Sequence, residues 1–354
     1  MNAANSTLTL STARSVLPPA VKTVDRWLAE VNAPRSRSRG LDYGDLTGMV
    51  FSECGIDPNA MNRSERVRAL VSEDAMFRDA LDMSQADLAS RAASLLSDAV
   101  NASDGFSKCG LVMYSHTAVD ENFYQSTACR IASELELSKA PHFSVAQLQG
   151  ASFFQALDIG DAFLSTDEKM DSALFIASEK WPIPYPRVMG LPAVFSDGAV
   201  AMQFVRAGSK PGLRLVSSTV KCFDDFGAVH AAHGTMNLSA ICHAVNETVG
   251  SFMQACGVEA NDIASLLTSC GCPTLDRSIR ESLGVPERTL NAVSDDIGYL
   301  SAADIPYKLS QALTLVTNGT LAEGSLILAI GVGLGGSVGA ALFKAEGVNG
   351  EANG

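Results

Sequence analysis

Positive charge is scarce in this sequence. Its 354 residues include 26 Lys and Arg against 39 Asp and Glu, which gives a formal net charge of −13 at pH 7. Proteins that bind nucleic acid or anionic membrane surfaces usually present a basic field, and here the mean field repels phosphate. The composition therefore argues against both kinds of partner, although it is compatible with a local basic patch.

Export and membrane signals are also missing. The sequence starts Met1-Asn-Ala-Ala-Asn-Ser-Thr-Leu8, without the basic segment and apolar run of a secretory signal peptide. The 18 residues from Leu326 to Phe343 carry no charge, but five of them are glycine, which a lipid-facing helix would tolerate poorly. We therefore expect a cytoplasmic protein without a membrane span, and we interpret 326–343 as two strands joined by a glycine turn.

Disulfide bonds are not expected. Eight cysteines are spread through the chain, at positions 54, 109, 129, 222, 242, 256, 270 and 272. Without a secretory start, this usage is typical of a reduced cytosolic protein. Cys270-Gly271-Cys272 has the spacing of a redox or metal pair, but no second Cys or His pair is close in sequence, so it is a weak zinc signal. We expect no metal and no cofactor.

Apolar residues are abundant, at 47% of the chain, so a sizeable core is expected. Strand-like apolar runs alternate with helical patterns, which indicates an α/β fold. The expected strands are 110–115, 143–148, 173–178, 199–205, 213–220, 264–269 and 325–330, with 199–205 and 213–220 close enough to pair. The expected helices are 21–31, 85–100, 126–137, 151–164, 235–256, 274–283 and 302–316. The second half repeats the first, which suggests two duplicated halves, 1–205 and 206–346, and a flexible tail at 347–354.

Four segments, in order, resemble the β-ketoacyl-ACP synthase III branch of the thiolase superfamily. They are 126–135 with 143–145 and 151–157, similar to the family's helix, strand and nucleophile helix; Phe195-Ser-Asp-Gly-Ala199, similar to its Phe-x-Asp-Gly-Ala turn; Gly298-Tyr-Leu-Ser-Ala-Ala-Asp-Ile-Pro306, similar to its Gly-Asn-Thr-Ser-Ala-Ala-Ser-x-Pro helix start; and Gly333-Leu-Gly-Gly-Ser-Val-Gly-Ala-Ala-Leu342, similar to its glycine loop. The resemblance covers about residues 84–344. It implies the thiolase fold, with two related halves in a five-layer α-β-α-β-α core, and dimers formed across the N-terminal half.

The resemblance also implies acyl transfer on thioesters of CoA or acyl carrier protein. In the family, a cysteine lies at a helix N-terminus, where the helix dipole and a nearby histidine favour the thiolate. A His and an Asn, or a His and an Asp in acyltransferase relatives, handle the incoming nucleophile. Backbone N–H groups of the nucleophile and of the glycine loop form the oxyanion hole.

The nucleophile position is substituted in this sequence. Counting back from Leu157 places it on Gly150, and counting forward from Phe143 places it on Gln149. Neither side chain is a nucleophile, so the conclusion survives a slip of one residue. The nearest hydroxyl belongs to Ser152, two residues into the helix.

The remaining positions of the family site are also changed. The histidine position falls on Ser269, with Cys270 beside it, and the asparagine position falls on Tyr299. Asp304 matches the Asp of the acyltransferase relatives, and Gly335 occupies the oxyanion glycine position. Five histidines are present, at 116, 142, 230, 233 and 243, and none falls on a catalytic position of the family.

Two hypotheses follow from a retained scaffold with a substituted site. In the first, the chain is a catalytically degenerate partner, in specialised fatty-acyl or polyketide-type metabolism, of a ketoacyl-synthase-like homologue that keeps Cys and His, or it pairs with itself. In the second, it is an active acyltransferase or condensing enzyme on acyl-CoA or acyl-ACP, with a site rebuilt from Ser152, Ser269, Cys270, Tyr299 or Asp304. A serine nucleophile needs an adjacent base, and the family's base position offers only a serine. We therefore favour the first hypothesis.

Overall fold

The structure, a computed structural model, describes residues 6–32, 63–101, 106, 108–118, 125–181, 186–188, 192–223, 237–269, 271–286 and 297–347. Its strands are β1 (Leu8–Val16), β2 (Val21–Thr23), β3 (Met76–Arg78), β4 (Cys109–Ser115), β5 (His142–Ser144), β6 (Ser172–Glu179), β7 (Gly198–Arg206), β8 (Gly212–Cys222), β9 (Ile263–Ser269), β10 (Leu326–Gly333) and β11 (Ser337–Glu346). Its α-helices are α1 (Val24–Asn32), α4 (Ser64–Arg68), α5 (Gln85–Asn101), α6 (Thr127–Glu134), α7 (Ser152–Thr166), α8 (Leu238–Cys256), α9 (Pro273–Leu283) and α10 (Asp304–Thr317). Single 3-10 turns are η1 (Gln149–Ala151), η2 (Ala260–Asp262) and η3 (Ser301–Ala303).

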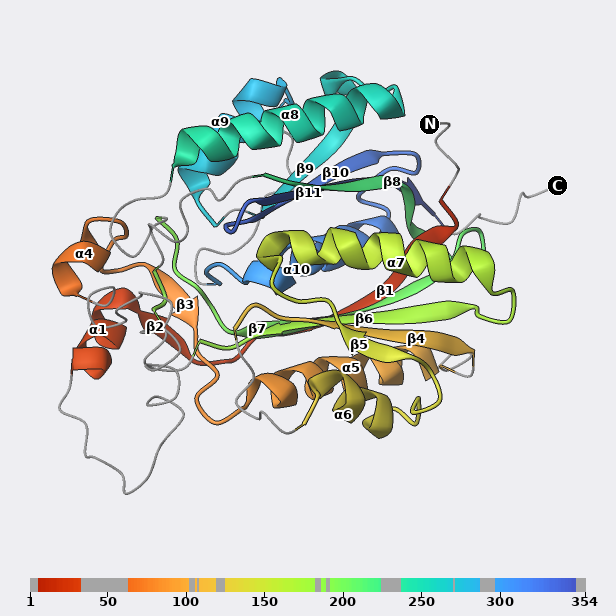
Figure 1. Ribbon diagram of the computed structural model, residues 1–354, viewed down its shortest axis with the longest axis horizontal. Coiled ribbons are helices and arrows are strands. Elements are labelled where there is room, and N and C mark those ends of the chain that lie inside the picture. The colour runs from red at the N-terminus through yellow and green to blue at the C-terminus, as the bar shows by residue number, and fades with distance from the viewer. Residues whose placement is uncertain are drawn as a thin grey trace.

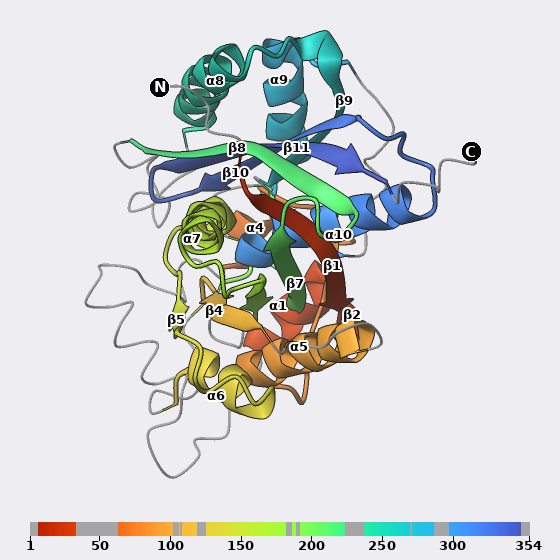
Figure 2. The ribbon, with the colours of Figure 1, turned by 90° about the vertical axis from the view of Figure 1, so that its right-hand side faces the viewer.

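These elements form five layers (Figure 1). Helices α5 and α6 cover one outer face and α8 and α9 cover the other, while α7 and α10 lie between two layers of strands. The described strands hydrogen-bond in the order β5-β4-β6-β7-β1-β8-β11-β10-β9. Strands β1 and β8 pair only at Thr9–Arg214 and Leu10–Leu213, so the sheet folds at this junction and encloses α7 and α10, as Figure 2 shows. The five-layer thiolase-type arrangement expected from the sequence is confirmed.

The two halves of the chain repeat one topology. If the elements without a counterpart are left aside (β2, α1, α4, β3 and β5), the order β1-α5-β4-α6-α7-β6-β7 in the first half corresponds to β8-α8-β9-α9-α10-β10-β11 in the second. Their strands also lie in matching orders, β4-β6-β7-β1 and β9-β10-β11-β8. The expected duplication is therefore present. The expected division at residue 205 falls at the end of β7 and stays a prediction, as does the tail, of which 348–354 lie outside the described residues.

One expected pairing is wrong. The segments 199–205 and 213–220 do form β7 and β8, but β1 lies between them and runs antiparallel to β7 from Leu8 to Val16. A short connection brings two strands close in sequence, whereas pairing is decided by packing across the whole sheet. Smaller differences affect two elements: residues 21–23 of the expected helix form β2, which pairs with β3, and the expected strand 143–148 ends at Ser144.

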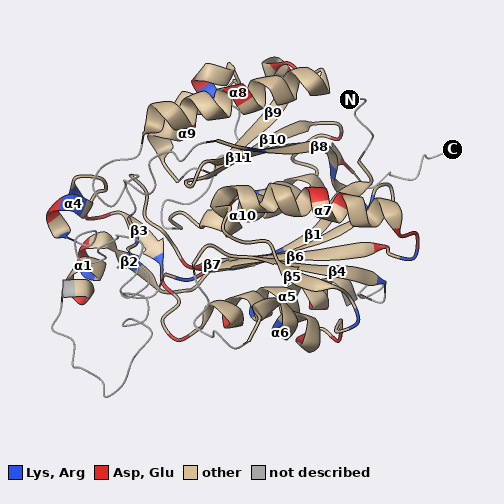
Figure 3. Cartoon of the chain, viewed as in Figure 1, with Lys and Arg blue, Asp and Glu red and all other residues tan. Residues whose placement is uncertain are grey.

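Helix α7 is apolar around most of its circumference because it is covered on both sides. Phe153 meets the ring of Phe175 on β6 edge-on, with centroids 5.2 Å apart, and Phe154 faces Gly339 of β11. A helix that is apolar all round is typical of a fully buried position. Figure 3 shows charged positions mainly on the outer helices and the turns, with acidic positions on α7 as well. Among the described helices, none has both the length and the apolar character needed to cross a membrane.

The Phe-x-Asp-Gly-Ala motif has a structural role. Asp197 is fully buried and accepts hydrogen bonds from the backbone N–H groups of Trp181 and Ala80, both at 2.9 Å. Its two oxygens also bind the buried Arg187 at 2.9 and 3.0 Å. The Arg187 guanidinium in turn lies 4.4 Å from the ring centre of Phe77 on β3. The motif thus fixes the small unit formed by β2, β3, α1 and α4 to the main body.

Candidate functional site

Two tight turns meet between the sheets at the centre of the molecule. Turn η1 leads into α7, and its symmetry-related counterpart η3 leads into α10; the two turns are in contact. Each starts with a non-glycine residue in the left-handed region, Gln149 with φ 48° and Ser301 with φ 47°. Such a backbone costs about 1–3 kcal/mol, and it is found most often at functional sites.

Gly150, one of the two positions on which the counted cysteine falls, is buried in η1 with no space for a side chain. A Cβ atom built there would lie 2.7 Å from the Val332 carbonyl oxygen. It would also lie 3.1 Å from both the carbonyl oxygen and the hydroxyl oxygen of Ser269. Real Cβ atoms essentially never approach another heavy atom within 3.0 Å. Strands β9 and β10 therefore leave no room for a side chain at Gly150, whereas Gln149, the other counted position, extends its side chain to the hairpin.

The glycines of the C-terminal hairpin make this close approach possible. A Cβ at Gly331 would overlap the Gly150 carbonyl, and a Cβ at Gly333 would overlap the Leu148 carbonyl. Residues 331 and 339 are paired across the hairpin, and a Cβ at Gly339 would overlap the Phe154 ring. One face of the hairpin is thus pressed against η1 and the start of α7.

Gly335, the predicted oxyanion glycine, is exposed in the turn between β10 and β11, and nothing lies within 4 Å of a Cβ built on it. The backbone N–H that reaches η1 belongs to its neighbour Leu334, which donates to Oε1 of Gln149 at 2.7 Å. Leu334, rather than Gly335, is therefore the hairpin residue whose backbone N–H contacts η1.

Ser152 and Ser269 are fully buried, and neither hydroxyl has a hydrogen-bond partner among the described residues. A buried hydroxyl without a partner costs about 1–3 kcal/mol. No described histidine bonds to either hydroxyl, and the other two candidate histidines, at 230 and 233, lie outside the described residues, as does Cys270. The described histidines are engaged or distant: His116 and His142 each bond a backbone carbonyl through Nδ1, and His243 is exposed on α8.

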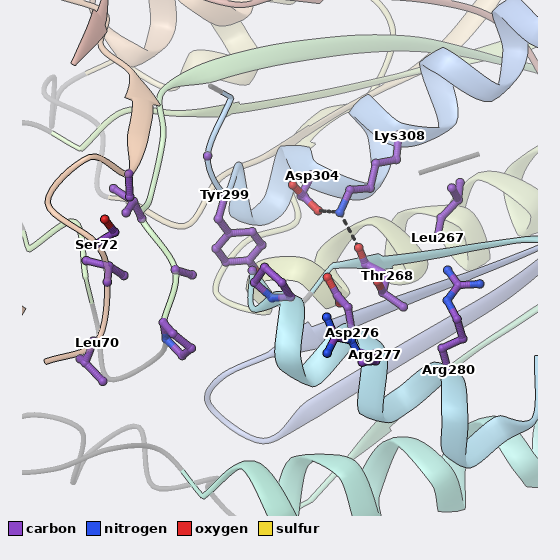
Figure 4. A pocket seen from close by; sticks show the side chains of 18 of the residues that line it. Leu70, Ser72, Leu267, Thr268, Asp276, Arg277, Arg280, Tyr299, Asp304 and Lys308 are labelled. Carbon is purple, nitrogen blue, oxygen red and sulfur yellow. Dashed lines mark hydrogen bonds and ion pairs between the residues drawn. The ribbon is translucent and has the colours of Figure 1, made fainter. Parts of the chain in front are cut away.

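Tyr299 and Asp304 are held by their neighbours. The Tyr299 ring packs at 5.1 Å from that of Phe195 and lies against Gly271. Asp304 is buried and forms an ion pair with Lys308 at 2.7 Å, and the Lys308 ammonium also donates to the Thr268 carbonyl at 2.6 Å. Figure 4 shows this chain of contacts. The carboxylate is therefore neutralised by a cation one helical turn away.

A cavity of about 920 Å³ lies beside the two turns. Its walls include Tyr299, Asp304 and Lys308, together with α9 and residues 70–76 (Figure 4). The described wall contains neither Gly150 nor Ser269. The structure thus brings Gly150 and Ser269 together in a packed centre and places Tyr299 and Asp304 on the cavity next to it.

Glu179 is a residue of this centre that sequence reasoning missed. It ends β6 and is fully buried. Its oxygens accept hydrogen bonds from the backbone N–H groups of Ala302 in η3 at 3.0 Å and of Ala118 at 3.2 Å. Burial raises the pKa of Glu179 to about 7. The sequence contained one signal for it: Glu179 directly follows the apolar run 173–178, and a charged residue that continues a buried strand can itself be buried.

Known proteins resemble this chain in sequence. Residues 253–345 match the family described as 3-oxoacyl-[acyl-carrier-protein (ACP)] synthase III C terminal. The β-ketoacyl-[acyl-carrier-protein] synthase III of Aquifex aeolicus (strain VF5) is 23% identical over 241 residues, which cover 64% of this chain and 74% of that protein. The synthase III of Coxiella burnetii (strain RSA 493 / Nine Mile phase I) is 23% identical over 244 residues with the same coverage.

Solved structures share the fold over nearly the whole chain. FabH, the 3-oxoacyl-(acyl carrier protein) synthase III of Pseudomonas aeruginosa PAO1, has a TM-score of 0.67 at 21% identity and covers 97% of this chain and 100% of its own. ChlB3, described as an acyltransferase, has a TM-score of 0.70 at 18% identity, with coverages of 96% and 98%. An OleA variant from Xanthomonas campestris has a TM-score of 0.70 at 18% identity, with coverages of 97% and 100%.

The fold and the paired turns define a thiolase-fold protein. The matches to residues 253–345 and to the synthase III relatives agree with the resemblance that the four motifs carry.

Proposed function

We propose that this chain is a non-catalytic partner subunit of an acyl-transferring or condensing enzyme in specialised fatty-acyl or polyketide-type metabolism. The observation that carries the proposal is the packing at Gly150, where a Cβ would lie 2.7 Å from the Val332 carbonyl oxygen. Covalent acyl transfer needs a side chain at the start of α7 that projects toward the thioester. At Gly150 strand backbone fills that volume, and at Gln149, the alternative position, the side chain is an amide, which is not a nucleophile.

Among the described residues, the other groups around the turns supply no substitute for a nucleophile and its base. A serine hydroxyl is activated by a base within hydrogen-bond reach, and the hydroxyls of Ser152 and Ser269 have no partner among the described residues. The acid at the acyltransferase position, Asp304, is engaged by Lys308. This arrangement supports a scaffold role.

The chain keeps the parts that association would use. Asp197 and Arg187 still hold the small unit against the body, and β5 ends the sheet among the described strands. An edge strand offers unpaired backbone groups to a second chain. Relatives are synthases named for acyl carrier protein, and one OleA structure holds lauric acid and lauroyl-CoA. The enzyme completed by this subunit would therefore act on acyl-CoA or acyl-ACP.

Intact-mass measurement tests the lack of catalysis. The purified chain is incubated with acetyl-, malonyl-, octanoyl- and lauroyl-CoA, with the synthase III of Aquifex aeolicus as a positive control. We expect acylation of the control and no covalent adduct or turnover from this chain. A stoichiometric acyl adduct on the wild-type chain would overturn the proposal.

Co-expression tests the partner role. This chain and a homologue that keeps Cys and His carry different affinity tags, and the product is examined by two-step purification and light scattering. We expect a dimer that contains both chains. A stable monomer at micromolar concentration contradicts association, and an unchanged homodimer in the presence of the homologue contradicts the partner role.

The cavity favours a second candidate, an acyltransferase with a rebuilt site. Its volume of about 920 Å³ lies in the range of small-molecule sites, and Asp304 lies on its wall. If the intact-mass experiment gives an adduct, peptide mapping identifies the acylated residue. An adduct that persists in Asp304→Asn excludes Asp304 from that reaction, whereas its loss supports the rebuilt site.

A further inference from the structure

The side-chain carbonyl of Gln149 accepts a hydrogen bond from a backbone N–H group of the C-terminal hairpin. Oε1 of Gln149 accepts a hydrogen bond from the N–H of Leu334 at 2.7 Å, across 185 residues of sequence. Leu334 directly follows β10, and the neighbouring Gly333 packs against the Leu148 carbonyl. The hydroxyl of Ser337, on the other arm of the hairpin, contacts the same carbonyl at 3.5 Å. Gln149 is thus part of a continuous contact between η1 and the hairpin.

This donor is suited to bind a substrate carbonyl. A backbone N–H in a partly buried turn needs an acceptor, and donors held at a turn beside a helix start are the groups that stabilise a thioester oxygen in acyl transfer. An amide carbonyl resembles a thioester carbonyl in its planar geometry and in its acceptor oxygen. The Gln149 amide therefore satisfies the donor as a substrate would.

The backbone of Gln149 indicates that this contact is specified. The residue has φ 48°, a region that disfavours side chains with a Cβ. Gly or Asn would relieve that strain, yet neither reaches Leu334 as Gln does: Gly has no side chain and Asn is one methylene shorter. Gln147, two residues earlier, has φ 68° but is exposed.

We propose that Gln149 is a built-in occupant of the carbonyl-binding donor at Leu334, which excludes the carbonyl of an acyl thioester from this centre. The inference rests on the proposed non-catalytic role. It names Gln149 as the residue that keeps a substrate carbonyl from binding to the Leu334 N–H. The donor itself remains in place, so removal of the Gln149 side chain leaves the Leu334 N–H without this acceptor.

Two readouts on matched variants test this occupancy. Gln149→Gly is compared with Gln147→Gly, because both replacements remove the backbone strain of a residue with positive φ in the same segment. Hydrogen exchange is followed at the Leu334 amide, and the dissociation constant for octanoyl-CoA is measured by calorimetry. A net hydrogen bond of about 1 kcal/mol corresponds to a five- to tenfold change in the fraction of free donor. We expect Gln149→Gly to exchange Leu334 about five- to tenfold faster and to bind octanoyl-CoA more tightly by a similar factor, while Gln147→Gly matches the wild type.

Gln149→Glu separates the acceptor from the bulk of the side chain. A carboxylate accepts the same hydrogen bond, so this variant should keep Leu334 protected and bind octanoyl-CoA no better than the wild type. If Gln149→Gly does not fold, as judged by thermal melting, Gln149→Asn replaces it, because Asn tolerates the left-handed region.

Equal exchange and equal affinity in Gln149→Gly and wild type overturn the inference. Faster exchange without tighter binding overturns it as well, since Gln149 would then only support the hairpin. These results are distinct from failure of the proposed function, which appears as acylation of the wild-type chain. If the wild type forms no adduct and Gln149→Gly binds octanoyl-CoA no more tightly than the wild type, the partner role stands and only the role of Gln149 is refuted.

Discussion

The replacement Gly150→Ala tests the closed centre directly. The added Cβ would lie 2.7 Å from the Val332 carbonyl oxygen and 3.1 Å from two oxygens of Ser269, whereas ordinary contacts begin at 3.4 Å. Val332 lies in β10, paired on both sides, so its carbonyl retreats only if three strands move. Overpacking of this kind costs about 1–3 kcal/mol, and the smaller entropy of unfolded Ala returns about 0.4–1 kcal/mol. We expect a net loss of about 1–2 kcal/mol in the free energy of unfolding.

Urea denaturation followed by tryptophan fluorescence measures this loss, since both tryptophans, Trp27 and Trp181, are buried. Gly250→Ala is the matched control: Gly250 lies inside α8 with nothing within 4 Å of a Cβ, so the same change should stabilise the chain by up to about 1 kcal/mol. A Gly150→Ala protein as stable as the wild type would show that the strands yield easily, and it would refute the argument that this position excludes a nucleophile. The larger Gly150→Cys should likewise give no condensing activity.

Three further results are expected. Burial raises the pKa of Glu179 from 4.5 to about 7, so between these values the folded chain holds a proton that the unfolded chain releases, and stability falls as pH rises. Relative to Glu179→Gln, the wild type should lose up to about 3 kcal/mol of unfolding free energy between pH 5 and 8. A difference between the two proteins that stays constant with pH would contradict a buried acid. Asp197→Asn, which leaves a buried arginine poorly paired, should cost about 3–5 kcal/mol of unfolding free energy, whereas Asp171→Asn in an exposed pair should cost less than about 1 kcal/mol; equal losses would contradict the anchoring role. Iodoacetamide at pH 7.5 should label the exposed Cys129 and spare Cys109, whose pKa burial raises to about 11, and equal labelling rates by peptide mapping would contradict its burial.

Local patterns in the sequence predicted most of the fold. Apolar runs bounded by breakers marked β4, β6, β9 and β10 within two or three residues, because strand formation there depends on neighbouring residues. The position of β1 between β7 and β8 depends on packing across the folded sheet, which no local pattern contains. The ion pair of Asp304 and Lys308 could have been inferred, since residues four apart share a helix face.

The centre was predictable as a set of positions but not as a set of contacts. Counting from the motifs placed the nucleophile position on Gly150 or Gln149 and the base position on Ser269, and the structure brings Gly150 and Ser269 side by side. The contact between Gln149 and Leu334 spans 185 residues. Leu334 donates through its backbone N–H, which almost every residue type has, so the sequence does not mark this position as a donor. Sequence therefore identifies which residues occupy the centre more readily than the contacts that they make.

The internal symmetry of the fold joins the two turns of this centre without any ligand. In the second half, the N–H of Ala302 in η3 has an internal acceptor, the carboxylate of Glu179 from the first half. In the first half, the side chain of Gln149 in η1 accepts from Leu334 of the second half. Each turn is thus joined to the opposite half by a hydrogen bond within the chain, and neither bond requires a ligand. Both turns therefore help to hold the two halves together, which is a property that the proposed scaffold role requires.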